Sequence, residues 1–233
     1  MPAPEHLAVV IPARNEEQLL PAALSSVAAA AMVLTEACGV RAGITVVLDS
    51  CTDGTAEAVE DLQARWAPEL QLQTVEGAFG TVGAARAAGI ASLPLPPGLW
   101  ISTTDADTVV PRDWLLGQYR LAAAGYGLVL GTAVPDPEDL TAEELSRWHS
   151  LHALEEGHPH VHGANLGFTA EAYNRAGGFA PLPAHEDVDL VARLKACGTP
   201  WTATDNIRVT TSGRRDGRAP VGFSLFLRQL LGT

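Results

Sequence analysis

Two aspartates, Asp105 and Asp107, follow a short segment that begins apolar and ends in small polar residues, Leu99–Thr104. Carboxylates spaced two residues apart at the end of a strand can both reach one hard divalent cation. Mg²⁺ or Mn²⁺ with oxygen ligands suits this arrangement, and such ions usually share their coordination shell with phosphates. Acidic pairs after strands are also common as solvated turn residues. The residues around the pair must therefore decide between a metal site and a solvated turn.

Strands and helices that alternate along the first half of the chain must position this pair. Four strands are predicted over Leu7–Ile11 (which Pro12 would stop), Ile44–Leu48, Leu70–Val75 and Trp100–Thr103, with helices after 15–17 and over Ala56–Trp66 and Gly83–Ala91. This alternation predicts an α/β fold with a mostly parallel central sheet and helices on both faces. Ligands of such sheets bind beyond the carboxyl ends of the strands. The polar turns 12–17, 49–55 and 105–108 lie at those ends, so we expect them to converge.

The second half of the chain has a less regular pattern. It predicts a strand over Gly127–Ala133, a loop over Pro135–Leu140, and helices over Thr141–Leu154, Ala170–Ala176 and Glu186–Ala196. Histidine occupies every second position from 158 to 162, a spacing that a strand would place on one face. We expect one domain over residues 1–233.

Composition and charge restrict the class of protein. Hydrophobic residues make up 47% of the chain and charged residues 18%, which predicts a packed core rather than disorder. The net charge of −12 argues against nucleic-acid binding, which needs a positive field. The three cysteines form no CxxC pair, so neither a disulfide framework nor a cysteine zinc site is expected. Met1–His6 lacks a signal-peptide pattern, and Ala22–Ala37 is interrupted by polar residues and predicts a packed helix. We therefore expect no transmembrane segment and a cytoplasmic location.

The motifs together resemble the family 2 inverting glycosyltransferases, which have the nucleotide-diphospho-sugar transferase fold called GT-A. The resemblance runs in order through Val9–Glu17, Asp49–Thr55, Gly83–Gly89, Asp105–Asp107 and Gly177–Leu194. It implies transfer of a sugar from a UDP- or GDP-linked donor to a hydroxyl acceptor, with Mn²⁺ or Mg²⁺ as cofactor. It also implies a nucleotide-binding half at residues 1–110 and an acceptor and catalytic half at residues 111–233.

For the donor, the resemblance implies contacts with the nucleotide from Pro12, Ala13, Arg14, Glu16, Asp49, Arg86 and Asp105. Asp49 would accept the N–H of a uracil or guanine base, or serve as a turn residue or helix cap. Arg86 would reach the base and diphosphate with its fork of N–H groups, or lie along the helix surface. Asp107 would bind the metal ion directly, with Asp105 between ion and ribose. The ion would bridge the two phosphates.

For the acceptor, the resemblance implies that Asp187 is the base that deprotonates the attacking hydroxyl, with Glu186 orienting the acceptor or the loop. Both could instead be helix N-terminal carboxylates stabilised by the helix dipole. Gly163, Ala164 and Asn165 are expected to line the sugar pocket, with His162 on the acceptor side. His158, His160 and His162 are interpreted as acceptor-side or surface histidines, with a zinc site as the alternative. No histidine follows His185, so the third metal ligand stays open.

The end of the chain carries a basic loop, in which Arg214 and Arg215 could close over the diphosphate or lie in solvent. The apolar tail Val221–Leu230 could pack on the core, form a dimer contact or touch a membrane-associated acceptor.

Two alternative functions are compatible with the same nucleotide-binding sheet. A sugar nucleotidyltransferase usually has a glycine-rich phosphate loop after the first strand, and residues 12–17 contain no glycine. A non-catalytic nucleotide-sugar binder would not need both Asp107 and Asp187.

Overall fold

The computed structural model describes residues 2–94, 96–152 and 154–214. Arg215 and the tail Val221–Leu230 lie outside the described residues. The strands are β1 (His6–Ala13), β2 (Ala42–Asp49), β3 (Leu72–Gly77), β4 (Leu99–Thr103), β5 (Thr108–Val109), β6 (Leu128–Pro135), β7 (Leu166–Thr169) and β8 (Trp201–Thr211). The helices are α1 (Leu20–Cys38), α2 (Thr55–Trp66), α3 (Val82–Ala91), α4 (Trp114–Ala123), α5 (Ala142–Leu151), α6 (Ala170–Arg175) and α7 (Glu186–Ala196), with short 3-10 turns η1 (Pro137–Asp139) and η2 (Gly163–Asn165).

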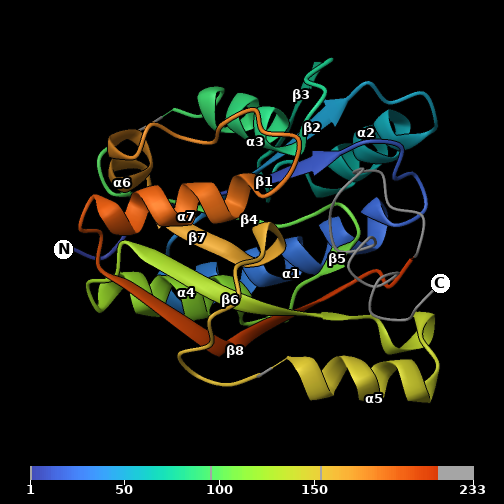
Figure 1. Ribbon diagram of the computed structural model, residues 1–233. Coiled ribbons are helices and arrows are strands. Elements are labelled where there is room, and N and C mark those ends of the chain that lie inside the picture. The colour runs from blue at the N-terminus through green and yellow to red at the C-terminus, as the bar shows by residue number, and fades with distance from the viewer. Residues whose placement is uncertain (1, 95, 153, 215–233) are drawn as a thin grey trace.

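The strands form one sheet in the order β3-β2-β1-β4-β7-β6-β8-β5. β3, β2, β1 and β4 run parallel to one another, as do β6 and β8. β7 runs antiparallel to both of its neighbours, and β5 runs antiparallel to β8. The predicted mostly parallel sheet is therefore confirmed, and the four strands of the first half carry their carboxyl ends to one edge (Figure 1).

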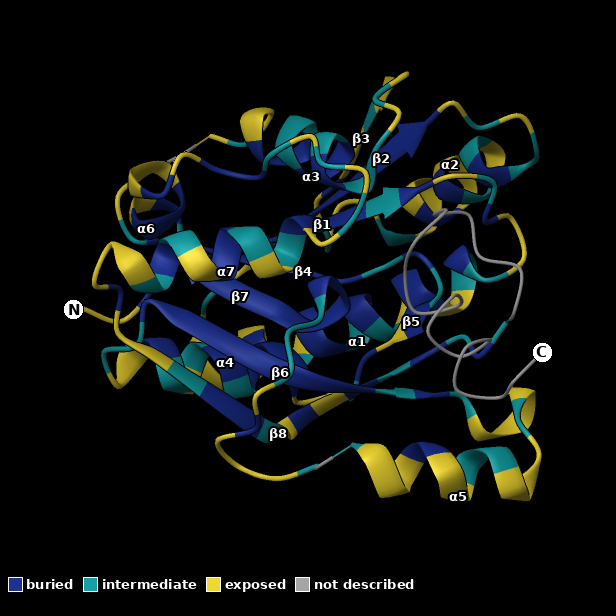
Figure 2. Ribbon diagram, in the orientation of Figure 1, coloured by how far each residue is buried: buried dark blue, intermediate teal, exposed yellow. Residues whose placement is uncertain are grey.

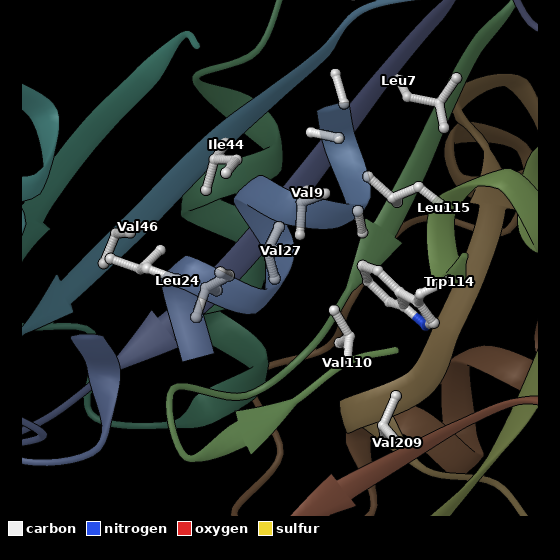
Figure 3. Close-up of a cluster of buried hydrophobic side chains, with 14 of the residues drawn as sticks. Leu7, Val9, Leu24, Val27, Ile44, Val46, Val110, Trp114, Leu115 and Val209 are labelled. Atoms are coloured by element: carbon white, nitrogen blue, oxygen red, sulfur yellow. The ribbon is translucent and has the colours of Figure 1, made fainter. Parts of the chain in front are cut away.

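Both faces of the sheet are covered by helices, as the alternation of elements predicts (Figures 1 and 2). Successive side chains of β1 point to opposite faces. Leu7, Val9 and Ile11 join a cluster with α1, α2 and α4, whereas Ala8 and Val10 join a second cluster with α3, α6 and α7. Figure 3 shows the first cluster, where Val9, Leu24, Val27 and Ile44 meet between strand and helix. Such burial on both faces explains why the strand sequences are almost wholly apolar.

α1 is the one helix in the described part of the chain that has the length and apolar composition of a membrane span. Eight of its residues are buried in the structure, among them Leu20, Leu24, Val27 and Leu34. The expectation of a packed helix over 22–37 is therefore met by these core contacts.

Several predicted elements differ from the observed ones. β1 continues through Pro12 to Ala13, because β4 ends opposite Val10 and Pro12 has a strand on one side only. The expected strand over 158–162 is wrong, since this segment has no regular structure. β5, α4, β7 and β8 were not predicted, and Thr210 and Thr211 belong to β8 rather than to the basic loop. α7, by contrast, has the predicted bounds, with acidic residues in its first turn and basic residues in its last, as the helix dipole favours.

Candidate active site

Hydrogen bonds connect the turn after β1 to the turn after β2. Asn15 Oδ1 accepts a hydrogen bond from the backbone N–H of Thr52 at 2.7 Å, and the N–H of Glu16 donates to Thr55 Oγ1 at 2.8 Å. Asp53 accepts the N–H of Glu17 and the N–H and hydroxyl of Thr55, so it also connects the two turns. The converging turns predicted from the sequence are thus held in place by bonds that span almost forty residues of chain.

Asp49 lies buried at the end of β2. Its Oδ1 accepts the N–H of Phe79 at 2.7 Å and the N–H of Gly80 at 3.3 Å, so it anchors the loop that leads into α3. Asp49 does not cap α2, which begins after Gly54. Its hydrogen bonds within the described residues all use Oδ1, and its expected contact with a nucleotide base stays a prediction. Pro12, Ala13 and the exposed Arg14 lie at the same edge, where β1 ends.

Arg86 on α3 is buried, with 2% of its surface exposed. Its Nη2 pairs with Asp105 Oδ1 at 2.5 Å, and its Nη1 pairs with Glu186 Oε1 at 2.5 Å. A side chain at Gly163 would collide with this guanidinium, since an added Cβ would lie 2.6 Å from both terminal nitrogens. A position along the helix surface, one of the two expectations for Arg86, is wrong, because the side chain is buried. Its expected contact with the base and diphosphate of the donor stays a prediction. In the structure the guanidinium pairs with two carboxylates, one in the turn after β4 and one at the start of α7.

Glu186 and Asp187 begin α7 on the far side of Arg86. Burial raises the pKa of Glu186, and the charge of Asp187 adds to this effect, whereas Arg86 opposes it. Asp187 is half-buried, and its Oδ2 accepts the N–H of Gly163 at 2.7 Å. Its Oδ1 accepts the N–H of Val188 at 2.8 Å, so the plane of the carboxylate is set by two backbone groups.

Asp107 lies beyond the end of β4 and faces the loop after β8. Its Oδ2 is 2.9 Å from Arg214 Nη2, and the hydroxyl of Thr211 donates to its Oδ1 at 3.3 Å. Burial raises the pKa of Asp107 to about 6, and the charges of Asp105 and Glu16 act in the same direction. Asp105 and Asp107 are hard oxygen donors of the kind that Mg²⁺ and Mn²⁺ prefer. Within the described ranges, no group of three or more His, Cys, Asp or Glu side chains is arranged around a metal position.

Asn165 departs from its expected place in the sugar pocket. Its side chain is buried, and its Oδ1 accepts the indole N–H of Trp114 at 2.9 Å. Its amide group donates to the carbonyls of Thr132 at 2.8 Å and Ile207 at 2.7 Å. All of its polar atoms are used inside the protein, so Asn165 ties η2 to α4, β6 and β8. Gly163 and Ala164 are also buried, and the role of Gly163 is carried by its backbone.

We expect Asn165→Ala to destabilise the protein and to leave nucleotide binding in place. The substitution leaves three buried polar groups without a hydrogen-bond partner. We therefore expect the free energy of unfolding to fall by about 2–4 kcal/mol. Urea denaturation measures the loss. Asn174→Ala, at an exposed position of α6, is the matched control and should change stability by less than about 0.5 kcal/mol. If the Asn165→Ala variant were as stable as wild type but no longer bound nucleotide, Asn165 would have to line the ligand pocket as expected from the sequence.

The histidines between α5 and η2 form a group centred on His160. Its ring lies 5.3 Å from that of His152, 5.8 Å from that of His158 and 6.0 Å from that of His162, measured between centroids. His158 is 2% exposed, so the expected surface position is wrong for this residue. Burial lowers the pKa of His162 to about 4, and the neighbouring His160 lowers it further, whereas Asp187 opposes the shift. The ring of His162 is therefore uncharged at neutral pH. Among these histidines, His162 interacts with Asp187.

This pKa predicts a specific loss of stability in acid. The unfolded chain binds a proton to His162 near pH 6.5, but the folded protein resists it down to about pH 4. Stability should therefore fall as the pH drops from 6.5 to 4, by up to about 3 kcal/mol from this residue. Chemical denaturation across this range should show a shallower decline for His162→Gln. His6→Gln, at an exposed position of β1, should follow wild type, and parallel curves for all three proteins would refute the assignment.

Some contacts of the site have no signal in the sequence, although Glu16 and Arg214 were both expected there. Glu16 and Arg214 pair through the two terminal guanidinium nitrogens although 198 positions separate them, and the hydroxyl of Thr211 donates to Asp107. The local spacing around each residue does not predict its partner. The hydrogen bond from the N–H of Gly163 to Asp187 also has no sequence signal, because every residue type except proline has a backbone N–H.

Comparison with known proteins adds to this geometry. The family model described as glycosyl transferase family 2 matches residues 8–179. The chain belongs to glycosyl transferase family 2. The matched range contains the residues of the first three turns and Asn165, and it ends seven residues before Glu186. No curated protein matches the sequence.

Solved structures share the fold of this glycosyltransferase at low sequence identity. A mannosyltransferase from Pyrobaculum calidifontis, PcManGT, in complex with GDP-Man and Mn²⁺ has a TM-score of 0.68 and 22% identity, over 97% of this chain and 70% of that one. TarS residues 1–349 from S. aureus gives 0.65 and 16%, over 97% and 69%. GalNAc-T7 with UDP, GalNAc and Mn²⁺ gives 0.65 and 14%, over 97% and 48%. These similarities show that the fold is GT-A, and the chain spans only part of the length of each.

Proposed function

We propose that this family 2 glycosyltransferase is a metal-dependent inverting enzyme that moves a sugar from a UDP- or GDP-linked donor to a hydroxyl acceptor. One observation carries the proposal. Arg86 joins Asp105, in the acidic pair after β4, to Glu186, which precedes the half-buried Asp187. The buried Arg86 thus holds Asp105, at the expected donor end of the site, close to the start of α7, which carries the expected base Asp187. An inverting transfer needs these two ends at a fixed separation, with the sugar between them.

In this proposal Asp187 accepts the proton of the acceptor hydroxyl as the oxygen attacks C1 of the sugar. The carboxylate is oriented by the N–H groups of Gly163 and Val188 and is partly exposed, so an acceptor can reach it. The start of a helix favours the charged form of a carboxylate. Asp187 would therefore act through its position. Glu186, held by Arg86, keeps the first turn of α7 in place.

The residues at the donor end fit a divalent cation. Asp105 and Asp107 bring two carboxylates together in a largely buried place, and Asp105 and Glu16 both raise the pKa of Asp107. Such a concentration of negative charge favours a hard cation. Asp107 would hold the ion with Asp105 beside it, and the ion would offset charge on the departing nucleoside diphosphate. The bound Mn²⁺ of PcManGT and GalNAc-T7 agrees with this assignment for related folds.

Thermal unfolding with UDP, GDP, CDP and dTDP, each with and without Mn²⁺, tests the proposal. We expect one nucleotide to raise the unfolding temperature in a metal-dependent way. At 100 times its dissociation constant it would add about 2.7 kcal/mol, a shift of about 5–10 °C for a chain of this size. The shift should vanish in Asp107→Asn.

The matched control is Asp113→Asn, which removes an exposed carboxylate near the start of α4 that caps nothing through its side chain. This variant should keep the full nucleotide shift. Absence of any shift with all four nucleotides would contradict a nucleotide-sugar donor. A shift that is the same without metal would contradict the metal dependence alone.

A further inference from the structure

Arg214 lies where the donor end of the site has its greatest negative charge. Its Nη1 is 2.7 Å from Glu16 Oε2, and its Nη2 contacts both Glu16 Oε1 and, at 2.9 Å, Asp107 Oδ2. Glu16 is buried, and Asp107 is largely buried. Asp105 adds a third carboxylate nearby. Arg214 thus offsets the charge of Glu16 and Asp107, while Arg86 pairs with Asp105.

The segment that carries Arg214 is fastened over Asp107 by other bonds. The N–H of Ser212 donates to the carbonyl of Asp107 at 3.0 Å, and the N–H of Gly213 donates to Asp139 Oδ2 at 2.7 Å. These contacts hold the backbone of residues 212 and 213, whereas the guanidinium is held only by its ion pairs with Glu16 and Asp107. Rotation of the Arg214 side chain would therefore break these ion pairs and leave the contacts of the backbone in place.

A divalent ion bound to Asp107 Oδ2 would compete with Arg214 for that oxygen. Mg²⁺ binds a carboxylate oxygen at about 2.0–2.1 Å. With Arg214 at 2.9 Å from the same oxygen, the two cations would repel each other across a few ångströms of largely buried space. Metal binding at this oxygen would therefore displace the guanidinium. A displaced arginine needs another anion, and a diphosphate matches its fork of N–H groups.

We propose that Arg214 is an internal counter-ion that makes the binding of metal and of the donor diphosphate mutually dependent. Metal alone must expel Arg214 from Asp107 without compensation, so it binds weakly. Metal together with a nucleoside diphosphate gives Arg214 a new partner, so each ligand strengthens the other by the same factor. This inference rests on the proposed function, because it needs a metal and a diphosphate at one site.

The test measures Mn²⁺ binding by the electron paramagnetic resonance signal of the free ion, with and without UDP or GDP. In wild type, we expect weak binding of Mn²⁺ alone and at least about tenfold tighter binding with the matching nucleotide. Arg214→Gln should bind Mn²⁺ alone more tightly than wild type, and its nucleotide affinity should fall. The coupling between the two ligands should shrink by at least about tenfold.

Arg208→Gln is the matched control, because it removes one positive charge from β8, the strand that precedes Arg214, at a pair with Asp205. It should retain wild-type coupling. Arg214→Lys keeps the charge without the fork and should lie between wild type and Arg214→Gln. This variant also serves as the test if Arg214→Gln does not fold, as judged by its thermal unfolding.

Unchanged or weaker binding of Mn²⁺ alone in both Arg214 variants would overturn the inference, as would coupling equal to that of wild type. These outcomes leave the proposed function standing, because wild type still binds both ligands. Failure of wild type to bind either nucleotide with Mn²⁺ would overturn the proposed function, and the inference with it.

Discussion

Asp187→Asn is expected to lower kcat for sugar transfer by about 10²–10⁴-fold, which is the usual effect of removing a positioned general base. The asparagine keeps one oxygen that can accept the N–H of Gly163, so the start of α7 should keep its geometry. Release of nucleoside diphosphate from a panel of UDP- and GDP-sugars measures the rate. Nucleotide affinity should be unchanged, because the proposed function places Asp187 at the acceptor end of the site.

Asp189→Asn is the matched control for this change. Asp189 lies one half-turn further along α7 and pairs with Arg193 at 2.7 Å, away from Gly163. Loss of this partly exposed pair should cost less than about 1 kcal/mol of stability and leave the rate near that of wild type. Normal turnover in Asp187→Asn would mean that another group takes the proton, or that the acceptor arrives already ionised.

Arg86→Met is expected to destabilise the folded protein by about 3–5 kcal/mol, because it leaves Asp105 and Glu186 without their buried partner. The corresponding fall in unfolding temperature is roughly 6–20 °C for a domain of this size. Urea denaturation and calorimetry measure both values. The same variant should lose the nucleotide-dependent thermal shift, since Asp105 and the first turn of α7 are no longer held together.

The pH dependence of this loss distinguishes a charge effect from a packing effect. Burial already raises the pKa of Glu186, and removal of Arg86 raises it further. The unpaired Glu186 carboxyl should then take up a proton in the folded state, so the difference from wild type should shrink as the pH falls from 7 towards 5. A loss that is constant with pH would indicate a cavity rather than unpaired charge. Arg208→Met, in an exposed pair, should cost less than about 1 kcal/mol at either pH.

Much of the fold could be predicted because the first half of the chain is locally consistent. Apolar runs of strand length alternate with amphipathic helices, and this periodicity is a property of neighbouring residues. Helix α7 was predicted with its observed bounds, since its acidic start, basic end and following glycine are all local signals. β7, of four residues, and β5, of two, are too short for such a pattern. Their strand structure comes from pairing with distant partners.

The chemistry of single residues was harder to place than the elements that carry them. Asn165 lies in a segment of small residues that resembles a pocket wall, yet its amide is turned into the core by Trp114 and two carbonyls. The resemblance implies that Arg86 contacts the diphosphate, and only the structure shows that two carboxylates from other elements pair with it. Burial of a polar group depends on which partners satisfy its hydrogen bonds.

By itself the sequence determined that this protein has a mostly parallel α/β sheet with its polar turns at one edge, and it pointed to the family 2 glycosyltransferases. It also picked out Asp105, Asp107 and Asp187, because motif type and spacing are local properties. Only the tertiary structure decided that Arg86 bridges Asp105 and Glu186 and that Arg214 reaches Glu16 and Asp107. These contacts join residues 19 to 198 positions apart, and such pairings arise only once the strands have brought their ends together.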